Sequence, residues 1–254
     1  GQADELTDKL YRDAVAAAAR ALAGSVAGDA AFCLADAELP HRDLAWRLAQ
    51  AAQILKDSTY RCDELKSKKE ESKKGIGKLV FVARGKDADA LDAAIRRGEA
   101  IADGMALAKT LGNLPGNVCT PGYLATTARK LAKDHKIKVE VLEQDDMEKL
   151  GMGALLSVAR GSHEPPKFIV LNYKGGKAKE KPVVLVGKGI TFDTGGISLK
   201  PGEGMDEMKF DMGGAASVLG TLAAVARLKA RVNLIGVIAA CENMPDGRAI
   251  KPGD

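Results

Sequence analysis

The sequence predicts an α/β protein, and three observations lead to that fold class. Of its 254 residues, 46% are hydrophobic and 28% are charged, a composition typical of folded globular chains and not of disordered ones. Glycine is frequent, with 28 residues, while aromatic residues make up only 4%, which suits tight loops and alanine-packed helices. Short apolar stretches also alternate with segments of helical periodicity. Such alternation predicts a largely buried sheet whose faces are covered by helices.

The first part of the chain is expected to contain three helices and one strand. Apolar residues recur near the helical period over 6–22 and 43–55, which predicts two helices. A compact apolar run over 79–83, bounded by glycines, predicts a strand. One long alanine-rich helix is expected over 87–110, before glycine and proline residues end it. This helix is expected to connect two domains.

The second part of the chain is expected to alternate strands and helices. Thr120 followed by Pro121 predicts the start of a helix that runs to about His135, because a hydroxyl cap and a proline at the first position both favour helix initiation. Four further strands are expected over 139–142, 168–173, 182–187 and 232–239, and two further helices over 147–150 and 215–228.

The formal net charge of +4 is concentrated in one lysine-rich run. Residues 66–78 hold six lysines and two glutamates, which accounts for the whole excess. We interpret the run as a solvated loop, with contact to a DNA backbone as the alternative, although no aromatic residue within it could stack on bases. No apolar run approaches the roughly 18 residues of a membrane span, and the chain does not begin with a signal peptide. A cytoplasmic protein without a membrane partner is expected.

The most informative stretch covers residues 186–214, where two lysines and two aspartates lie among glycines. Lys188 and Asp193 fall in a loop expected over 188–196, at the carboxyl end of a predicted strand. In α/β proteins, ligands bind at the edge of the sheet where the carboxyl ends of the strands lie. Asp211 lies on a separate turn that opens a helix, whose amino terminus also favours negative charge nearby. The stretch is therefore a candidate binding or catalytic site.

The residue types in this stretch suit a hydrolytic site with two metal ions. Such a site needs several anionic oxygens, one of them able to bridge both ions. Asp193, followed by Thr-Gly-Gly, fits the bridging position, and Asp211, followed by Met-Gly-Gly, fits a second ligand. Lys188 could ligate a metal only as a neutral amine, with a pKa well below its usual value of about 10.4. Lys200 would stay charged and stabilise an oxyanion.

Two other interpretations of the stretch stay open on spacing alone. Charged residues near glycine-rich turns are commonly loop surface. Glycine-rich turns that lead into helix amino termini also bind phosphate groups. The sequence contains no Gly-x-x-x-x-Gly-Lys-[Ser/Thr] motif, and two carboxylates would repel a phosphate unless a metal intervened.

The ordered blocks of this region resemble the leucyl (cytosol) aminopeptidase family. The resemblance extends from about Gly98 to Asp254 and is weak before it. The blocks read Asn-Leu-Pro-Gly-Asn at 113–117, Gly-Met-Gly-Ala-Leu-Leu-Ser-Val-Ala-Arg-Gly-Ser at 151–162, Val-Gly-Lys-Gly-Ile-Thr-Phe-Asp-Thr-Gly-Gly at 186–196, Leu-Lys-Pro at 199–201, Met-Lys-Phe-Asp-Met-Gly-Gly at 208–214 and Glu-Asn-Met-Pro-Asp-Gly at 242–247.

The resemblance implies a smaller N-terminal α/β domain over 1–86, a connecting helix over 87–112 and the first part of a catalytic α/β domain with a helix-covered mixed sheet over 113–254. Family members carry an Asn-Thr-Asp-Ala-Glu-Gly-Arg block that supplies two further carboxylate ligands and an arginine that helps to hold a bicarbonate base. That block is absent from this sequence, and the opening strands are absent too. The chain is therefore expected to be an internal fragment, with both domains incomplete.

The activity implied by the resemblance is removal of the N-terminal residue, preferably leucine or another apolar residue, from peptides. The implied cofactors are two divalent ions, zinc or manganese with magnesium as a further candidate, which carry the attacking hydroxide. Peptides with a free N-terminus and a homohexamer of the same chain are the implied partners. A DNA-binding or scaffolding role and a catalytically incomplete fragment are the alternatives. The implied site residues are the ligands Lys188, Asp193, which bridges, and Asp211, the catalytic cation Lys200, and Met208 in the pocket for the first side chain.

Overall fold

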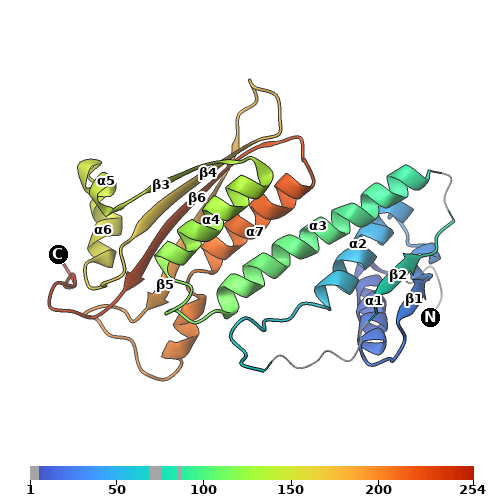
Figure 1. Cartoon of the computed structure of the whole chain (residues 1–254), viewed down its shortest axis with the longest axis horizontal. Coiled ribbons are helices and arrows are strands. Elements are labelled where there is room, and N and C mark those ends of the chain that lie inside the picture. The colour runs from blue at the N-terminus through green and yellow to red at the C-terminus, as the bar shows by residue number, and fades with distance from the viewer. Residues whose placement is uncertain (1–5, 69–75, 85–86) are drawn as a thin grey trace. The chain divides into compact units, whose positions relative to one another are not determined.

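The computed structural model describes residues 6–68, 76–84 and 87–254 (Figure 1). The chain divides into two compact units, residues 1–103 and residues 104–254. The division falls inside the long helix α3, Ala88–Asn113, which contributes residues to both units. The sequence-predicted domain boundaries at residues 86 and 112 lie on either side of this point. Within the described ranges, no helix is long and apolar enough to cross a membrane.

The first unit packs two helices and the start of α3 around a small parallel strand pair. Thr7 and Asp43 cap the first two helices, because each side chain accepts a hydrogen bond from a backbone N–H of the first turn. The predicted helices and the predicted strand are confirmed, but the sequence analysis missed β1, a strand of only four residues, Asp-Ala-Ala-Phe. The elements are α1 (Asp8–Ala23), β1 (Asp29–Phe32), the 3₁₀ helix η2 (Leu34–Asp36), α2 (Leu44–Asp57) and β2 (Lys78–Phe81).

The second unit confirms the predicted alternation of strands and helices. Thr120 caps α4 and Pro121 is its first residue, as the sequence predicted. The pattern missed two short elements, α6 and the 3₁₀ helix η3. The elements after α3 are α4 (Pro121–His135), β3 (Lys138–Leu142), α5 (Gln144–Lys149), α6 (Gly153–Ala159), β4 (Lys167–Lys174), β5 (Val183–Asp193), η3 (Met205–Phe210), α7 (Gly213–Arg227) and β6 (Asn233–Asn243).

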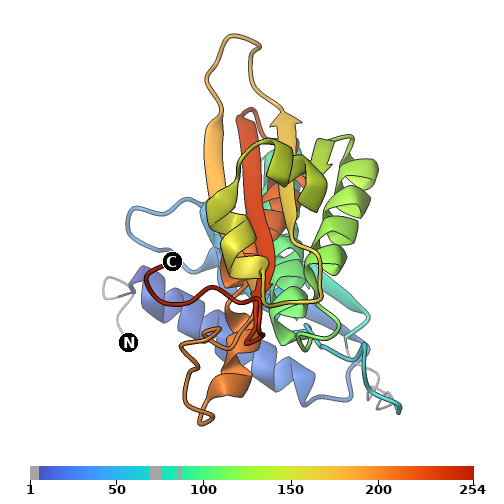
Figure 2. The same ribbon diagram turned by 90° about the vertical axis from the view of Figure 1, so that its left-hand side faces the viewer.

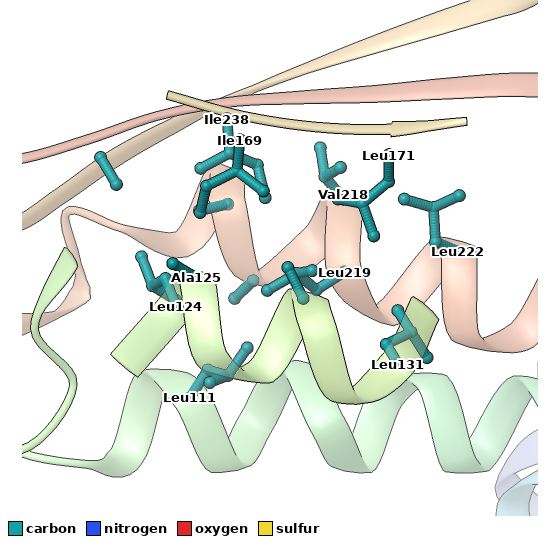
Figure 3. Close-up of a cluster of buried hydrophobic side chains, with 14 of the residues drawn as sticks. Leu111, Leu124, Ala125, Leu131, Ile169, Leu171, Val218, Leu219, Leu222 and Ile238 are labelled. Atoms are coloured by element: carbon teal, nitrogen blue, oxygen red, sulfur yellow. The ribbon is translucent and has the colours of Figure 1, made fainter. Parts of the chain in front are cut away.

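These strands form a mixed sheet in the order β3-β4-β6-β5. Strand β6 lies between its neighbours (Figure 2), antiparallel to β4 and parallel to β5. Helix α7 packs on β5 and β6, and α4 packs on β4. The core between helices and sheet is apolar (Figure 3). Its fully buried side chains include Leu111, Leu124, Ile169, Leu171, Leu219, Leu222 and Ile238.

Helices α3 and α7 approach each other closely at two glycines of the second unit. A Cβ atom added at Gly220 of α7 would lie 2.4 Å from the carbonyl oxygen of Gly104, and one added at Gly104 would lie 2.4 Å from that of Gly220. Both contacts are with backbone, which cannot yield as a flexible side chain can. The two positions therefore require glycine.

Gly220→Ala is expected to lower the free energy of unfolding of the complete protein by about 1–3 kcal/mol, because the helices must move apart. Gly122→Ala is the matched control. This glycine lies in α4, and its added Cβ would meet only the Thr120 hydroxyl, at an ordinary 3.6 Å. The control should raise stability by about 0.4–1 kcal/mol. Urea unfolding of both variants measures the difference, and equal effects would contradict the close crossing.

Candidate active site

Strand β5 extends farther than the sequence predicted. It pairs with β6 as far as Asp193, so Lys188 and Asp193 lie on the strand itself, and the loop predicted over 188–196 is wrong for its first six residues. Glycine normally weakens a strand, and the glycines around Lys188 favoured a loop. In the structure Gly187 lies against the start of α7, where an added Cβ would be 2.6 Å from the Gly214 carbonyl oxygen. Gly187 therefore allows β5 and the start of α7 to pack closely.

One extra residue in β5 brings Lys188 and Asp193 to the same face of the strand. Lys188 is paired with Ala239 and Asp193 with Asn243, with a register shift after Ile190, so five steps along β5 match four along β6. Side chains alternate between faces, and residues five apart in a regular strand point to opposite faces. The bulge cancels that difference.

Lys188 and Asp211 form an ion pair between β5 and the turn before α7. The Lys188 Nζ atom lies 2.7 Å from the Oδ1 atom of Asp211 and donates a hydrogen bond to it. The Oδ2 atom lies at the same distance, but the geometry gives this buried oxygen no hydrogen bond. The lysine side chain is 59% exposed and that of Asp211 only 20% exposed. One carboxylate oxygen is therefore buried and held by the ion pair, without a hydrogen bond of its own.

Asp193 is held by three hydrogen-bond donors. The backbone N–H of Gly195 and the Nδ2 atom of Asn243 donate to its Oδ1 atom, at 2.9 and 2.8 Å, and the Nζ atom of Lys200 donates to Oδ2 at 2.7 Å. Burial acts to raise the pKa of Asp193, but the hydrogen bonds from Lys200, Gly195 and Asn243 outweigh it and hold the pKa below its ordinary 3.8. The side chain is therefore a carboxylate at neutral pH.

A glycine turn returns Lys200 to the end of β5. Gly195 and Gly196 have φ angles of +89° and +70°, a left-handed conformation that side chains strain. After this turn the backbone N–H of Lys200 donates to the Thr194 carbonyl at 2.9 Å. The Lys200 Nζ atom also lies 3.1 Å from the Sδ atom of Met208 in η3. The turn thus places a cation between a carboxylate and an apolar side chain.

The structure therefore joins the five predicted residues through three contacts: Lys188 with Asp211, Lys200 with Asp193, and Lys200 with Met208. Their donor chemistry fits a divalent cation: Asp193 is ionised, and Asp211 has a buried oxygen that makes no hydrogen bond, although Lys188 Nζ lies 2.7 Å from it. Lys188 would have to lose its proton to act as a ligand. In the described part of the chain, no cluster of three or more His, Cys, Asp or Glu side chains could hold a metal. The chemistry fits, but the number of ligands is small for two ions.

The prediction missed one polar residue of the site, Asn243. In the sequence it is only part of the block at 242–247 that resembles the family. No local sequence signal connects it with Asp193, which lies fifty positions earlier. Asn243 lies four residues beyond the strand predicted over 232–239, and only the structure extends that strand to this residue. The predicted lysine-rich run over 66–78 lies partly outside the described residues, and Lys66 pairs with Asp63 at 2.8 Å.

Comparison with known protein families shows to which family the chain belongs. The family model for the catalytic domain of the cytosol aminopeptidases matches residues 106–254, and the model for their N-terminal domain matches residues 1–69. The chain belongs to the cytosol aminopeptidase family. The resemblance drawn from the sequence is thereby confirmed.

The relatives of this chain are longer than the chain itself. The probable cytosol aminopeptidases of Aromatoleum aromaticum and Azoarcus sp. are 61% and 62% identical to it, over 100% of its length. Each alignment covers 51% of the relative, so the chain spans about half the length of the curated relatives it matches. Among solved structures, the bottromycin maturation enzyme BotP in complex with Mn is similar, with a TM-score of 0.86 and 35% identity over 100% of this chain and 52% of that one. This similarity confirms the mixed α/β fold.

Proposed function

We propose that the complete protein is a metal-dependent aminopeptidase that removes an N-terminal leucine or other apolar residue from peptides. The observation that carries the proposal is that two ion pairs, Lys188 with Asp211 and Lys200 with Asp193, both involve strand β5. Its relatives are named as probable cytosol aminopeptidases. A similar solved enzyme is described in complex with Mn, an ion that carboxylate oxygens suit.

Lys188, Asp193 and Asp211 are the residues that would hold two divalent ions, zinc or manganese, with magnesium as a third candidate. Such ions, when bound, bind a free amine, polarise a carbonyl and activate water for hydrolysis. Asp211 would offer its buried Oδ2 atom, which makes no hydrogen bond. Lys188 would ligate as a neutral amine. We assign the remaining ligands, and the bicarbonate base, to parts of the complete protein beyond this chain.

Lys200 is proposed to bind the oxygen of the scissile carbonyl. Its Nζ atom lies 2.7 Å from Oδ2 of Asp193, which places it beside a proposed metal ligand. A positive charge stabilises an oxygen that gains negative charge in the transition state more than it stabilises the neutral carbonyl of the ground state. Met208, 3.1 Å from the same Nζ atom, would line the pocket for the first side chain of the peptide. An apolar neighbour there favours leucine over charged residues.

Metal removal and replacement test this function. The complete protein, freed of metal by a chelator, is expected to lose hydrolysis of leucinamide and to regain it with Mn²⁺ or Zn²⁺. N-acetyl-leucinamide serves as the matched substrate without a free amine, and it should not be cleaved under either condition. Undiminished cleavage by the metal-free protein, or equal cleavage of both substrates, would contradict the proposal.

The homohexamer and the cytoplasmic location stay predictions for the complete protein. DNA contact through residues 66–78 also stays an alternative. It requires binding to duplex DNA that weakens steeply as the salt concentration rises.

A further inference from the structure

We propose that Asn243 is a positioning residue that fixes the carboxylate of Asp193 and determines which of its two oxygens is open to a cation. This inference rests on the proposed function, because it takes Asp193 to be a metal ligand. It concerns a residue to which the sequence assigned no role. The two residues come from different strands and are joined by the parallel pairing of β5 and β6.

The two carboxylate oxygens of Asp193 accept different sets of hydrogen bonds. The Oδ1 atom accepts from both Asn243 Nδ2 and the Gly195 N–H, so its two lone pairs are in use. Among the described residues, the Oδ2 atom accepts a hydrogen bond from Lys200 Nζ alone. Lysine has a long, flexible side chain, here 37% exposed, and it can move away. Oδ2 is therefore the oxygen that can become free.

Asn243 is itself held firmly by the turn after β5. The backbone carbonyl oxygen of Asn243 accepts hydrogen bonds from the backbone N–H and the hydroxyl of Thr194, at 2.9 and 2.8 Å. Thr194 is itself only 5% exposed. Gly196 lies against its amide, and a Cβ added there would be 2.8 Å from Asn243 Oδ1. The carboxylate needs a donor, so the amide nitrogen must face Asp193. Backbone and side chain of Asn243 are thus both fixed.

A neutral amide is suited to this position beside cations. A second ammonium near Asp193 would repel a divalent ion, whereas an amide N–H orients the carboxylate without adding charge. Carboxylate ligands of metals are commonly held by such outer hydrogen bonds, and loss of one typically costs about 10–100-fold in metal affinity. Asn243 fits this role by its contact, its charge and its rigidity.

The test measures binding of Mn²⁺ alone to the complete metal-free protein, by titration calorimetry or by the electron paramagnetic resonance signal of free Mn²⁺. Asn243→Leu keeps the approximate shape and removes the donor. We expect its dissociation constant for Mn²⁺ to rise about 10–100-fold. If this variant does not fold, as judged by circular dichroism, Asn243→Ala replaces it.

Asn233→Leu is the matched control, because Asn233 lies at the other end of the same strand. Its amide bonds the backbone of Gly176, Lys177 and Glu180, far along the sheet from Asp193. It should lose stability and keep its Mn²⁺ affinity. Asp193→Ala is the reference for loss of a ligand and should bind Mn²⁺ more weakly than Asn243→Leu does.

The outcomes separate the inference from the proposed function. Weakened binding in Asn243→Leu with unchanged binding in Asn233→Leu supports the positioning role. Binding in Asn243→Leu as in the wild type, while Asp193→Ala loses it, overturns the role of Asn243 and leaves the proposed metal site standing. Unchanged Mn²⁺ binding in Asp193→Ala overturns both.

Discussion

Lys200→Ala in the complete protein is expected to lower kcat for leucinamide hydrolysis by about 10²–10³-fold, the usual effect of removing one donor to an oxyanion. The structure gives a second expectation for the same variant. Lys200 carries a positive charge 2.7 Å from Asp193, where it would repel a divalent ion. Its removal should therefore leave Mn²⁺ affinity unchanged or increase it. Steady-state kinetics at saturating metal and a Mn²⁺ titration measure the two quantities.

Lys130→Ala is the matched control for this experiment. Lys130 is an exposed lysine on α4, so the substitution removes the same charge and chain length elsewhere in the unit. It should keep wild-type kcat and metal affinity. If Lys200→Ala retained full turnover, or lost turnover only by losing metal, the assigned role of Lys200 would be wrong.

Asp211→Asn is expected to separate metal binding from stability. The side chain of Asp211 is 20% exposed and ion-paired with Lys188, and it is proposed to ligate a cation. The substitution keeps the shape and removes the charge. Mn²⁺ affinity should fall by more than about 100-fold, beyond the loss that follows removal of an outer partner. The ion pair with the exposed Lys188 is worth at most about 1 kcal/mol, so the metal-free variant should fold nearly as well as the wild type.

Asp206→Asn is the control for that prediction. Asp206 is an exposed aspartate of η3, five positions earlier, and it should alter neither metal affinity nor stability. Equilibrium unfolding of the metal-free proteins and Mn²⁺ titrations give both comparisons. A variant at Asp211 that loses stability but binds Mn²⁺ normally would show that the pair with Lys188 is structural and that Asp211 is no ligand.

Capping residues in the sequence predicted where helices begin, because a helix start depends on residues that are close in the chain. The hydroxyl and proline of Thr120-Pro121 determined where α4 begins, and Asp43 determined the start of α2, because a cap bonds the backbone two or three residues away. The residue types of the site were also predictable from the stretch 186–214. Carboxylates, lysines and glycines at close spacing restrict the chemistry before any fold is known.

The sequence analysis missed β1 and the end of β5, because both depend on pairing between strands that are distant in the sequence. The strand β1 has only four residues and is extended because it pairs with β2, more than forty residues later. Glycines around Lys188 favoured a loop, yet pairing with β6 kept β5 extended to Asp193. Strand formation depends on such partners more than on intrinsic preference.

The sequence by itself determined the family and predicted the candidate site residues Lys188, Asp193, Lys200, Met208 and Asp211. Only the tertiary structure decided that a bulge in β5 turns Asp193 to the face of Lys188, and that Asn243 donates to its carboxylate. The reason is physical. Residue type determines which groups can bind a cation, but the direction in which a carboxylate points depends on strand register and on donors brought close by the fold.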